Sequence, residues 1–277
     1  MTSPNSSPRR LAWSAQTHQG RVRRNNEDAF LGLRFDRREL TYLGKEGEAV
    51  INEHEFIFAV SDGMGGENAG EFASKVVLQT VINLVSREFH QKTQEEHLKP
   101  GKLLYDFCQR IHEHARDVSR YYEECRGMGA TLSLCWLQKG LAHIAHLGDS
   151  RIYYLPQDGQ IQQLTDDHTV TGRLVREGCL SEQEARRHPR RHQLERSIGC
   201  HPDPVQPQII ATPFIPGDHF LICTDGITDG VWNHGIEKFI HHPPPYLVGL
   251  PPAQRLVKEA LEASGRDNLT ALVLKVQ

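Results

Sequence analysis

The sequence has 277 residues, of which 38% are hydrophobic, and its formal net charge is -3. This length and apolar content suffice for one large domain, or two small ones, with a substantial core. The nearly balanced charge argues against a dedicated nucleic-acid-binding protein, because no basic block dominates the chain. The first ten residues are polar and no apolar run approaches the roughly 20 residues of a membrane helix, so we expect neither a signal peptide nor membrane insertion.

Cysteines are scattered along the chain without a CxxC pair. They are Cys108, Cys125, Cys135, Cys179, Cys200 and Cys223. This spacing predicts neither a zinc knuckle nor a disulfide scaffold. It favours reduced, buried thiols in a cytoplasmic protein.

The N-terminal part begins with residues 1–10, which are rich in Ser, Pro and Arg and predict a disordered tail. A first strand is expected over Leu11–Gln16. The loop after it brings basic side chains next to two adjacent acids, Glu27 and Asp28, and a second short strand then runs through Leu33.

The most informative stretch is residues 56–70, which follow a charged segment, 36–54, that we interpret as a hairpin outside the core. The apolar start of this stretch predicts a buried strand. It ends at Asp62, followed by glycines that permit tight turns and close approach to a ligand. Helical spacing of apolar residues then predicts a helix over about 67–88. Asp62 fits a cation ligand at a strand end, and the alternative is an ordinary turn or helix-capping acid.

The middle of the chain contains a polar linker, 90–100, and a second helix predicted over about 103–124. Lys139-Gly140 and Asp158-Gly159 are turn sequences between alternating segments, which predicts two hairpins. The expected strands are 131–137, 141–147, 152–155 and 161–164.

Residues 166–200 differ from the rest because they are highly charged and have no sustained apolar stripe. We interpret them as a flap over the surface. Short helices are expected at 171–178 and 181–187, and Ser181 with Glu184 forms a capping box at the start of the second.

The C-terminal part repeats the pattern of the central stretch. An apolar strand from Phe220 ends at Thr224-Asp225-Gly226. A last helix over 253–263 precedes Asp267 and a final strand over 271–276. Many strands joined by hairpins, with helices in separate blocks, predict packed antiparallel sheets flanked by helices, and not a doubly wound parallel sheet.

Four aspartates share one kind of position, at a strand edge beside Gly, Ser or Asn, and Glu27-Asp28 adds a fifth acidic site. The four are Asp62, Asp149, Asp225 and Asp267. Clustered carboxylates repel one another and are costly to desolvate. Divalent cations remove that cost, and ligation by oxygen alone suits Mg²⁺ or Mn²⁺ better than zinc. Five unrelated turn acids are the alternative, but a strand-Asp-Gly unit that occurs twice favours a shared site.

Seven motifs, in this order, resemble those of the bacterial PPM family, the metal-dependent type 2C serine/threonine protein phosphatases. They are Arg23-Arg24-Asn25-Asn26-Glu27-Asp28, Asp62-Gly63-Met64-Gly65-Gly66, Met128-Gly129-Ala130-Thr131, Gly148-Asp149-Ser150-Arg151, Leu164-Thr165-Asp166-Asp167-His168, Thr224-Asp225-Gly226 and Arg266-Asp267-Asn268. The resemblance runs from about residue 11 to residue 276. Each motif is weak alone, but seven in register are specific.

The resemblance implies an α+β fold, an α-β-β-α sandwich of two antiparallel sheets flanked by helix pairs, formed by one domain over residues 11–277. It also implies two or three divalent cations, Mn²⁺ or Mg²⁺, between the sheets. By motif position, Asp62 would bridge two of them. The carbonyl of Gly63 would complete one site, with Glu27 and Asp28 in its direct or water-mediated shell.

Further roles follow from the same resemblance. Asp225 and Asp267 would hold the other cation, and Asp149 with Asp225 would fit the weaker third position of bacterial members. Arg23 matches the arginine that binds the phosphate, because a guanidinium can bind two phosphoryl oxygens at once. Arg24 is the alternative for that role.

The implied reaction is hydrolysis of phosphoserine and phosphothreonine by a water molecule that two cations activate. The partners would be phosphorylated proteins, substrates of a cognate Ser/Thr kinase. Met64 stands where eukaryotic members often have a histidine, so the leaving group would be protonated by water or by another residue, with His168 either a donor or structural. Two other functions remain open: a catalytically silent phosphoprotein-binding module, and a small-molecule metal phosphatase. The basic residues 186–192 either attract phosphorylated peptide or form a solvated charged face.

Overall fold

The computed structural model describes residues 9–36, 38–51, 54–65, 69–91, 99–200 and 204–277. Most of the predicted tail (1–8) and of the predicted linker (92–98) lies outside these residues. The same is true of the three residues that follow Gly65 in the central motif. Arg10, which we assigned to the tail, is already the first residue of a strand.

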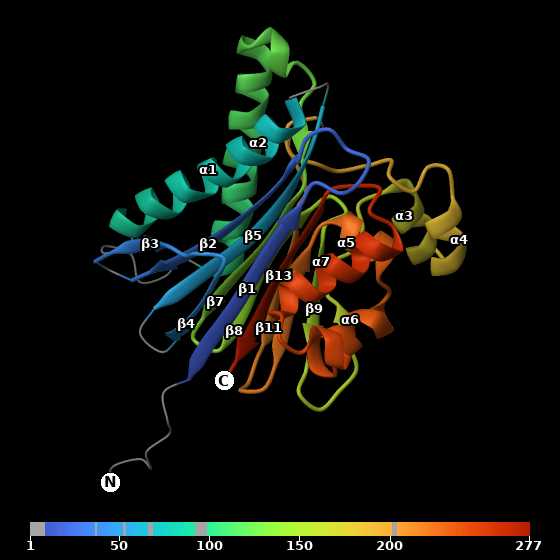
Figure 1. Cartoon of the computed structure of the whole chain (residues 1–277). Coiled ribbons are helices and arrows are strands. Elements are labelled where there is room, and N and C mark those ends of the chain that lie inside the picture. The colour runs from blue at the N-terminus through green and yellow to red at the C-terminus, as the bar shows by residue number, and fades with distance from the viewer. Residues whose placement is uncertain (1–8, 37, 52–53, 66–68, 92–98, 201–203) are drawn as a thin grey trace.

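Two antiparallel sheets form the centre of the molecule (Figure 1). The first sheet has the order β10-β9-β12-β13-β1-β4, and the second has the order β11-β8-β7-β5-β2-β3, with β6 beside β5. The first contains β1 (Arg10–His18), β4 (Glu46–Val50), β9 (Arg151–Leu155), β10 (Gln162–Gln163), β12 (His219–Cys223) and β13 (Leu269–Val276). The second contains β2 (Asp28–Phe35), β3 (Leu40–Tyr42), β5 (Glu55–Met64), β6 (Gly129–Ala130), β7 (Leu132–Gln138), β8 (Leu141–Leu147) and β11 (Gln208–Pro213).

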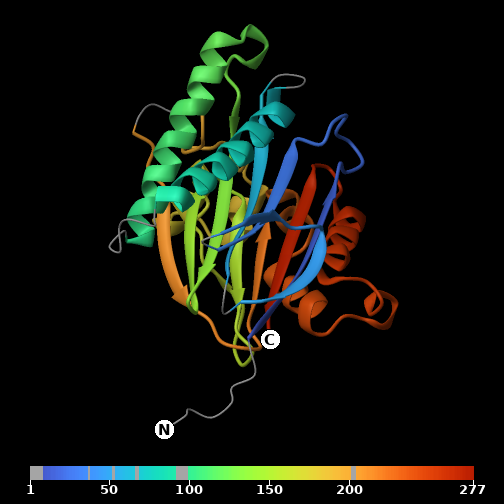
Figure 2. The ribbon, with the colours of Figure 1, turned by 90° about the vertical axis from the view of Figure 1, so that its left-hand side faces the viewer.

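Helices cover both outer faces of the paired sheets, so the predicted α-β-β-α sandwich is confirmed (Figure 2). The second sheet is covered by α1 (Ala69–Gln91) and α2 (Pro100–Tyr121). The first sheet is covered by α5 (Asp225–Gly230), α6 (Asn233–His241) and α7 (Pro252–Ala263). The segment predicted as a flap, residues 166–200 (the flap), contains α3 (Val170–Arg176) and α4 (Glu182–Arg187). Two 3-10 turns occur at Glu123–Cys125 and Pro245–Leu247.

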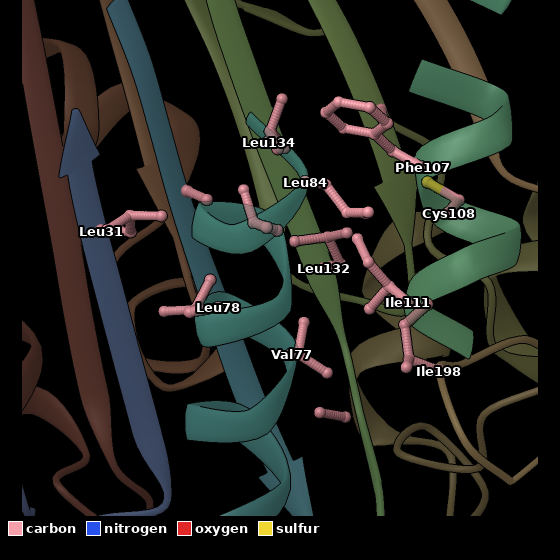
Figure 3. Packing of buried hydrophobic residues seen from close by; sticks show 14 of the residues in the cluster. Leu31, Val77, Leu78, Leu84, Phe107, Cys108, Ile111, Leu132, Leu134 and Ile198 are labelled. Carbon is pink, nitrogen blue, oxygen red and sulfur yellow. The ribbon is translucent and has the colours of Figure 1, made fainter. Parts of the chain in front are cut away.

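Strand β5 explains the continuous apolar run of the central stretch, because the strand is buried on both faces. Phe56 and Phe58 face the first sheet, where they pack with Trp13 and Phe220. The intervening Ile57 faces the helices. On that side, α1 packs against β5 and β2 and α2 packs against β8 and β11, with Leu132 of β7 between the two helices (Figure 3). Burial on two faces holds β5 firmly in the middle of the molecule, and its end carries Asp62.

The prediction of a hairpin over residues 36–54 is wrong. β3 pairs with β2 at the edge of the second sheet, whereas β4 pairs with β1 at the edge of the first. Gly47 on β4 lies against the indole of Trp13, and a Cβ atom there would collide with the ring. The segment therefore crosses from one sheet to the other, because each of its strands finds a better partner than its neighbour.

Candidate metal centre

The acids identified in the sequence gather at one end of the two sheets because of the strand directions. Asp28 opens β2 and lies opposite Asp62 on β5. Asp149 follows β8, which runs in the same direction as β5. Asp225 follows β12 and Asp267 precedes β13, its antiparallel neighbour. The charge of each of the other four raises the pKa of the Asp62 carboxyl, which places all five near one point.

The backbone of Asp62 is held by two of the predicted motifs. Its N–H donates to the Thr131 hydroxyl at 2.9 Å, and its carbonyl accepts from the Thr131 N–H at 2.8 Å. The same hydroxyl is 2.6 Å from that of Ser150, which follows Asp149. Thr131 and Ser150 therefore join two acid-bearing strand ends through buried hydrogen bonds.

Asp28 is 8% exposed, and only one of its two carboxyl oxygens has a hydrogen-bond partner among the described residues. Its Oδ2 accepts a hydrogen bond from the Thr224 hydroxyl at 2.8 Å. Its Oδ1 is buried and has no hydrogen-bond partner among the described residues, and the same holds for Oδ1 of Asp225. Buried acceptors without partners are rare, so both atoms are ready to bind an electropositive ligand.

Glycines let three segments meet beside Asp62. The N–H of Gly63 donates to the carbonyl of Glu27 at 3.1 Å. A Cβ atom on Gly63 would collide with the carbonyl oxygen of Gly70, the second residue of α1, and one on Gly70 would collide with the Glu27 carboxylate. These glycines are therefore required for close approach of chain segments to one another. Their predicted close approach to a ligand stays a prediction.

Asn268 holds the acidic loop that precedes β2. Its side-chain oxygen accepts from the N–H of Glu27 at 2.8 Å. Its side-chain nitrogen donates to the carbonyls of Gln19 and Asn25 at 2.8 and 2.9 Å. Asn268 therefore anchors the loop that carries Glu27, a contact that spans 241 residues of sequence.

Burial and mutual repulsion raise the pKa values of the clustered carboxyls. Burial raises the pKa of Asp28 to about 7, the Thr270 and Thr224 hydroxyls lower it, and Asp225 and Asp267 raise it further. The pKa values of Asp62 and Asp149 lie well above 3.8, first because of burial and then because of neighbouring acids. Burial also raises the pKa of Glu27. The cluster therefore resists full ionisation unless cations offset its charge.

The donor set fits divalent cations of the hard type. The clustered acids offer carboxylate oxygens, two of which are buried and without a hydrogen-bond partner among the described residues. Mg²⁺ and Mn²⁺ prefer such oxygen ligands. Binding of these ions would also remove the repulsion that raises the pKa values. The residues present therefore fit the cofactors that the sequence predicts.

Arg23 lies in the loop between β1 and β2, at the edge of the cluster. Its Nη2 donates to Oδ2 of Asp267 at 2.7 Å, and its side chain is 48% exposed. This bond is the main reason why the pKa of the guanidinium is raised. Among the described residues, the hydrogen bonds of Arg24 involve its backbone, whose carbonyl accepts from the side chain of Gln19 at 2.6 Å. The geometry therefore favours Arg23 as the arginine next to the acids.

Two further motifs contact each other at the base of the flap. Arg151 forms a bidentate ion pair with Asp167, at 2.5 and 2.7 Å, and both side chains are largely buried. The ring Nδ1 of His168 accepts a hydrogen bond from the backbone N–H of Gly148. The backbone N–H of His168 donates to the carbonyl of Gly148. Burial lowers the pKa of His168 to about 2, so its ring is neutral. These contacts support the structural alternative for His168.

The sequence analysis missed His192, which comes from the flap. Its Nδ1 lies 3.1 Å from Oδ2 of Asp225, and this contact raises the pKa of the imidazole. One ligand atom each of Asp149, His192 and Asp225 lie within 4.8 Å of one another. All three line a cavity of about 270 Å³ between the flap and α5. No local motif indicates this contact, because His192 and Asp225 are 33 residues apart.

The sequence profile of the family described as protein phosphatase 2C matches residues 47–264. This chain belongs to the protein phosphatase 2C family. A putative protein phosphatase 2C-type protein of Streptococcus pyogenes is 34% identical over 227 residues, which are 82% of this chain and 83% of that protein.

Other protein phosphatase 2C relatives agree with this assignment. The serine/threonine protein phosphatase PstP of Mycobacterium tuberculosis is 30% identical over 269 residues, which are 96% of this chain but 45% of PstP. The chain thus spans about half the length of that relative. A solved structure of the catalytic domain of PstP, in complex with two manganese ions, matches with a TM-score of 0.73 and 28% identity, covering 97% of this chain and 99% of that one.

As for membranes, none of the helices in the described part of the chain has the length and apolar character needed to span a bilayer.

Proposed function

We propose that this chain is a metal-dependent serine/threonine protein phosphatase, formed by one domain over residues 11–277 with a flap at about 166–200. The observation that carries the proposal is the convergence of five acids from distant segments, two of them with a buried, unpartnered oxygen, beside an exposed arginine. Membership of the protein phosphatase 2C family supports it.

The proposed ligands of the cations are Glu27, Asp28, Asp62, the Gly63 carbonyl, Asp149, Asp225 and Asp267. When bound, Mn²⁺ or Mg²⁺ ions acidify a water molecule and neutralise charge on a phosphoryl group. Asp62 would be the central residue of this ligand set, because it lies among the other acids and its backbone is fixed on both sides by Thr131. Two manganese ions in the solved PstP catalytic domain support this cofactor.

Arg23 is proposed to bind the phosphoryl oxygens of the substrate. A guanidinium has five N–H donors, and the hydrogen bond to Asp267 uses Nη2 of Arg23, so donors remain for an anion. The side chain is half exposed and can reach a bound phosphate at the surface. The substrates would then be proteins that a cognate kinase has phosphorylated on Ser or Thr.

We also propose a cytoplasmic location. All six cysteines are free thiols, and four of them are buried. Free thiols are typical of a reducing compartment.

The test is release of phosphate from a phosphothreonine peptide by the purified chain. We expect turnover with Mn²⁺ and none with EDTA, and a loss of at least about 100-fold in Asp62→Asn, the order of magnitude for removal of an essential electrostatic group. Asp117→Asn on α2 is the matched control, because that side chain is 58% exposed. Peptide binding without turnover would indicate the silent binding module, and turnover of nucleotides alone would indicate a small-molecule phosphatase.

A further inference from the structure

The end of the flap docks on α5, the short helix that begins with Asp225. Arg186 donates to the carbonyl of Thr228 at 2.6 Å, and its guanidinium lies 4.5 Å from the centre of the Trp232 ring. Arg191 approaches Asp229 at 4.0 Å. These contacts bring the last residue of the basic segment, His192, beside the metal centre. The segment is therefore docked on the body at Arg186 and Arg191, whereas Arg187 and Arg190 are exposed.

The imidazole of His192 lies between two carboxylates. Its Nδ1 is 3.1 Å from Oδ2 of Asp225, and its Nε2 is 3.8 Å from Oδ2 of Asp229. A metal-ligating histidine commonly directs its second nitrogen to a carboxylate, which orients the ring. Asp229 is in position for that role on one side, while Asp225 and Asp149 lie on the other.

The spacing of the three groups suits one ion. Adjacent ligand atoms on an ion at about 2.1 Å are about 3.0 Å apart, and opposite ones about 4.2 Å. The Nδ1 of His192 and Oδ2 of Asp225 are 3.1 Å apart, and the chosen atoms of all three residues fit within 4.8 Å. Oδ1 of Asp225 is buried and without a partner among the described residues, which points independently to a ligand.

We infer that His192 supplies a nitrogen ligand to a divalent transition-metal ion held between Asp149 and Asp225, and that this ion ties the flap to the body of the protein. The inference rests on the proposed function for the metal centre, but it concerns only the third position. The family resemblance supplies two carboxylates there, and the proposed nitrogen ligand is added from the flap. A nitrogen ligand favours first-row transition metals over Mg²⁺.

The flap would then respond to the identity of the metal. With Mn²⁺ bound, His192 links the flap to two aspartates of the body, in addition to the Arg186 and Arg191 contacts. With Mg²⁺, whose preferred ligands are oxygens, the link from His192 through the ion is lost and the flap keeps only its direct contacts with the body. Hydrogen exchange in residues 186–192 is therefore expected to be slower with Mn²⁺ than with Mg²⁺.

Electron spin-echo spectroscopy of the full chain loaded with Mn²⁺ tests the ligand directly. We expect modulation from a coordinated ¹⁴N nucleus in the wild type, its loss in His192→Gln, and its retention in His188→Gln. His188 is the matched control, because it lies on the same flap and its ring Nδ1 accepts a hydrogen bond from the N–H of Arg190 at 3.1 Å. No ¹⁴N modulation in the wild type, or full modulation in His192→Gln, would overturn the inference.

Hydrogen exchange with the same three proteins tests the tie to the flap. The difference between Mn²⁺ and Mg²⁺ should disappear in His192→Gln and persist in His188→Gln, and equal exchange with both metals in the wild type would contradict the inference. These outcomes are separable from the proposed function. Phosphatase turnover without ¹⁴N coupling would refute the His192 ligand and leave the proposed function intact. Coupling to ¹⁴N without turnover would refute the phosphatase activity and leave the His192 ligand intact.

Discussion

Replacing Asp28 by Asn removes one charge from the acid cluster while keeping the size of the side chain and an acceptor for the Thr224 hydroxyl. Burial raises the pKa of Asp28 from 3.8 to about 7. One pKa unit corresponds to about 1.4 kcal/mol, so the ionised carboxylate destabilises the metal-free fold by up to about 4 kcal/mol.

The sign of this effect depends on pH. Because the folded-state pKa is raised, the stability that Asp28 contributes is present below pH 3.8 and is lost as the pH rises through about 7. In EDTA at pH 8, Asp28→Asn should therefore melt higher than the wild type, by up to about 8 °C at roughly 2 °C per kcal/mol. At pH 5 the gain should be less than half as large.

Differential scanning fluorimetry at the two pH values measures this difference, with Asp117→Asn as the control for an exposed aspartate. Added Mn²⁺ should narrow the difference. The wild type gains roughly 2.7 kcal/mol at 100 times the dissociation constant, and Asp28→Asn gains less because it has lost an oxygen ligand. An Asp28→Asn variant that melts at or below the wild-type temperature at pH 8 in EDTA would refute the reasoning.

Three other substitutions test neighbouring parts of the site. Arg23→Gln should raise the KM for a phosphopeptide by about tenfold or more, the effect of one charge-assisted hydrogen bond. The free energy of unfolding should change by under about 1 kcal/mol, because the ion pair of Arg23 with Asp267 is half exposed. An unchanged KM would exclude Arg23 as the phosphate ligand. Gly148→Ala should lower the free energy of unfolding, measured in urea, by about 1–3 kcal/mol. The reason is that φ of Gly148 is 112° and the new Cβ would lie 2.5 Å from Cγ2 of Thr131. A variant as stable as the wild type would show that the loop adapts. Thr131→Val should lower the free energy of unfolding by about 1–3 kcal/mol, because the N–H of Asp62 loses its acceptor. An unchanged free energy of unfolding would mean that another group replaces the hydroxyl.

Local signals predicted the elements whose shape depends on nearby residues. The β7–β8 hairpin follows from alternation and from Lys139-Gly140, both of which have positive φ, at 49° and 79°. The capping box of Ser181 and Glu184 starts α4 as expected. The strand that carries Asp62 was recognisable because burial on both faces requires an uninterrupted apolar run.

Elements that depend on distant partners were not predictable in the same way. The separation of β3 from β4 depends on Trp13 packing over Gly47, a contact between remote segments. Helix α5 has six residues, two of them glycine, and is stabilised by the packing of Ile227 against the sheet instead of by helix propensity. His192 reaches Asp225 only because the flap docks on that helix.

The central claim is that the acids at this end of the sheets hold divalent cations. Anomalous diffraction from a crystal of the chain grown with MnCl₂ tests it most directly. We expect manganese peaks within ligand distance of the Asp62 carboxylate and of the Asp225 and Asp267 carboxylates. Manganese bound elsewhere, or no peak among these acids at saturating Mn²⁺, would contradict it.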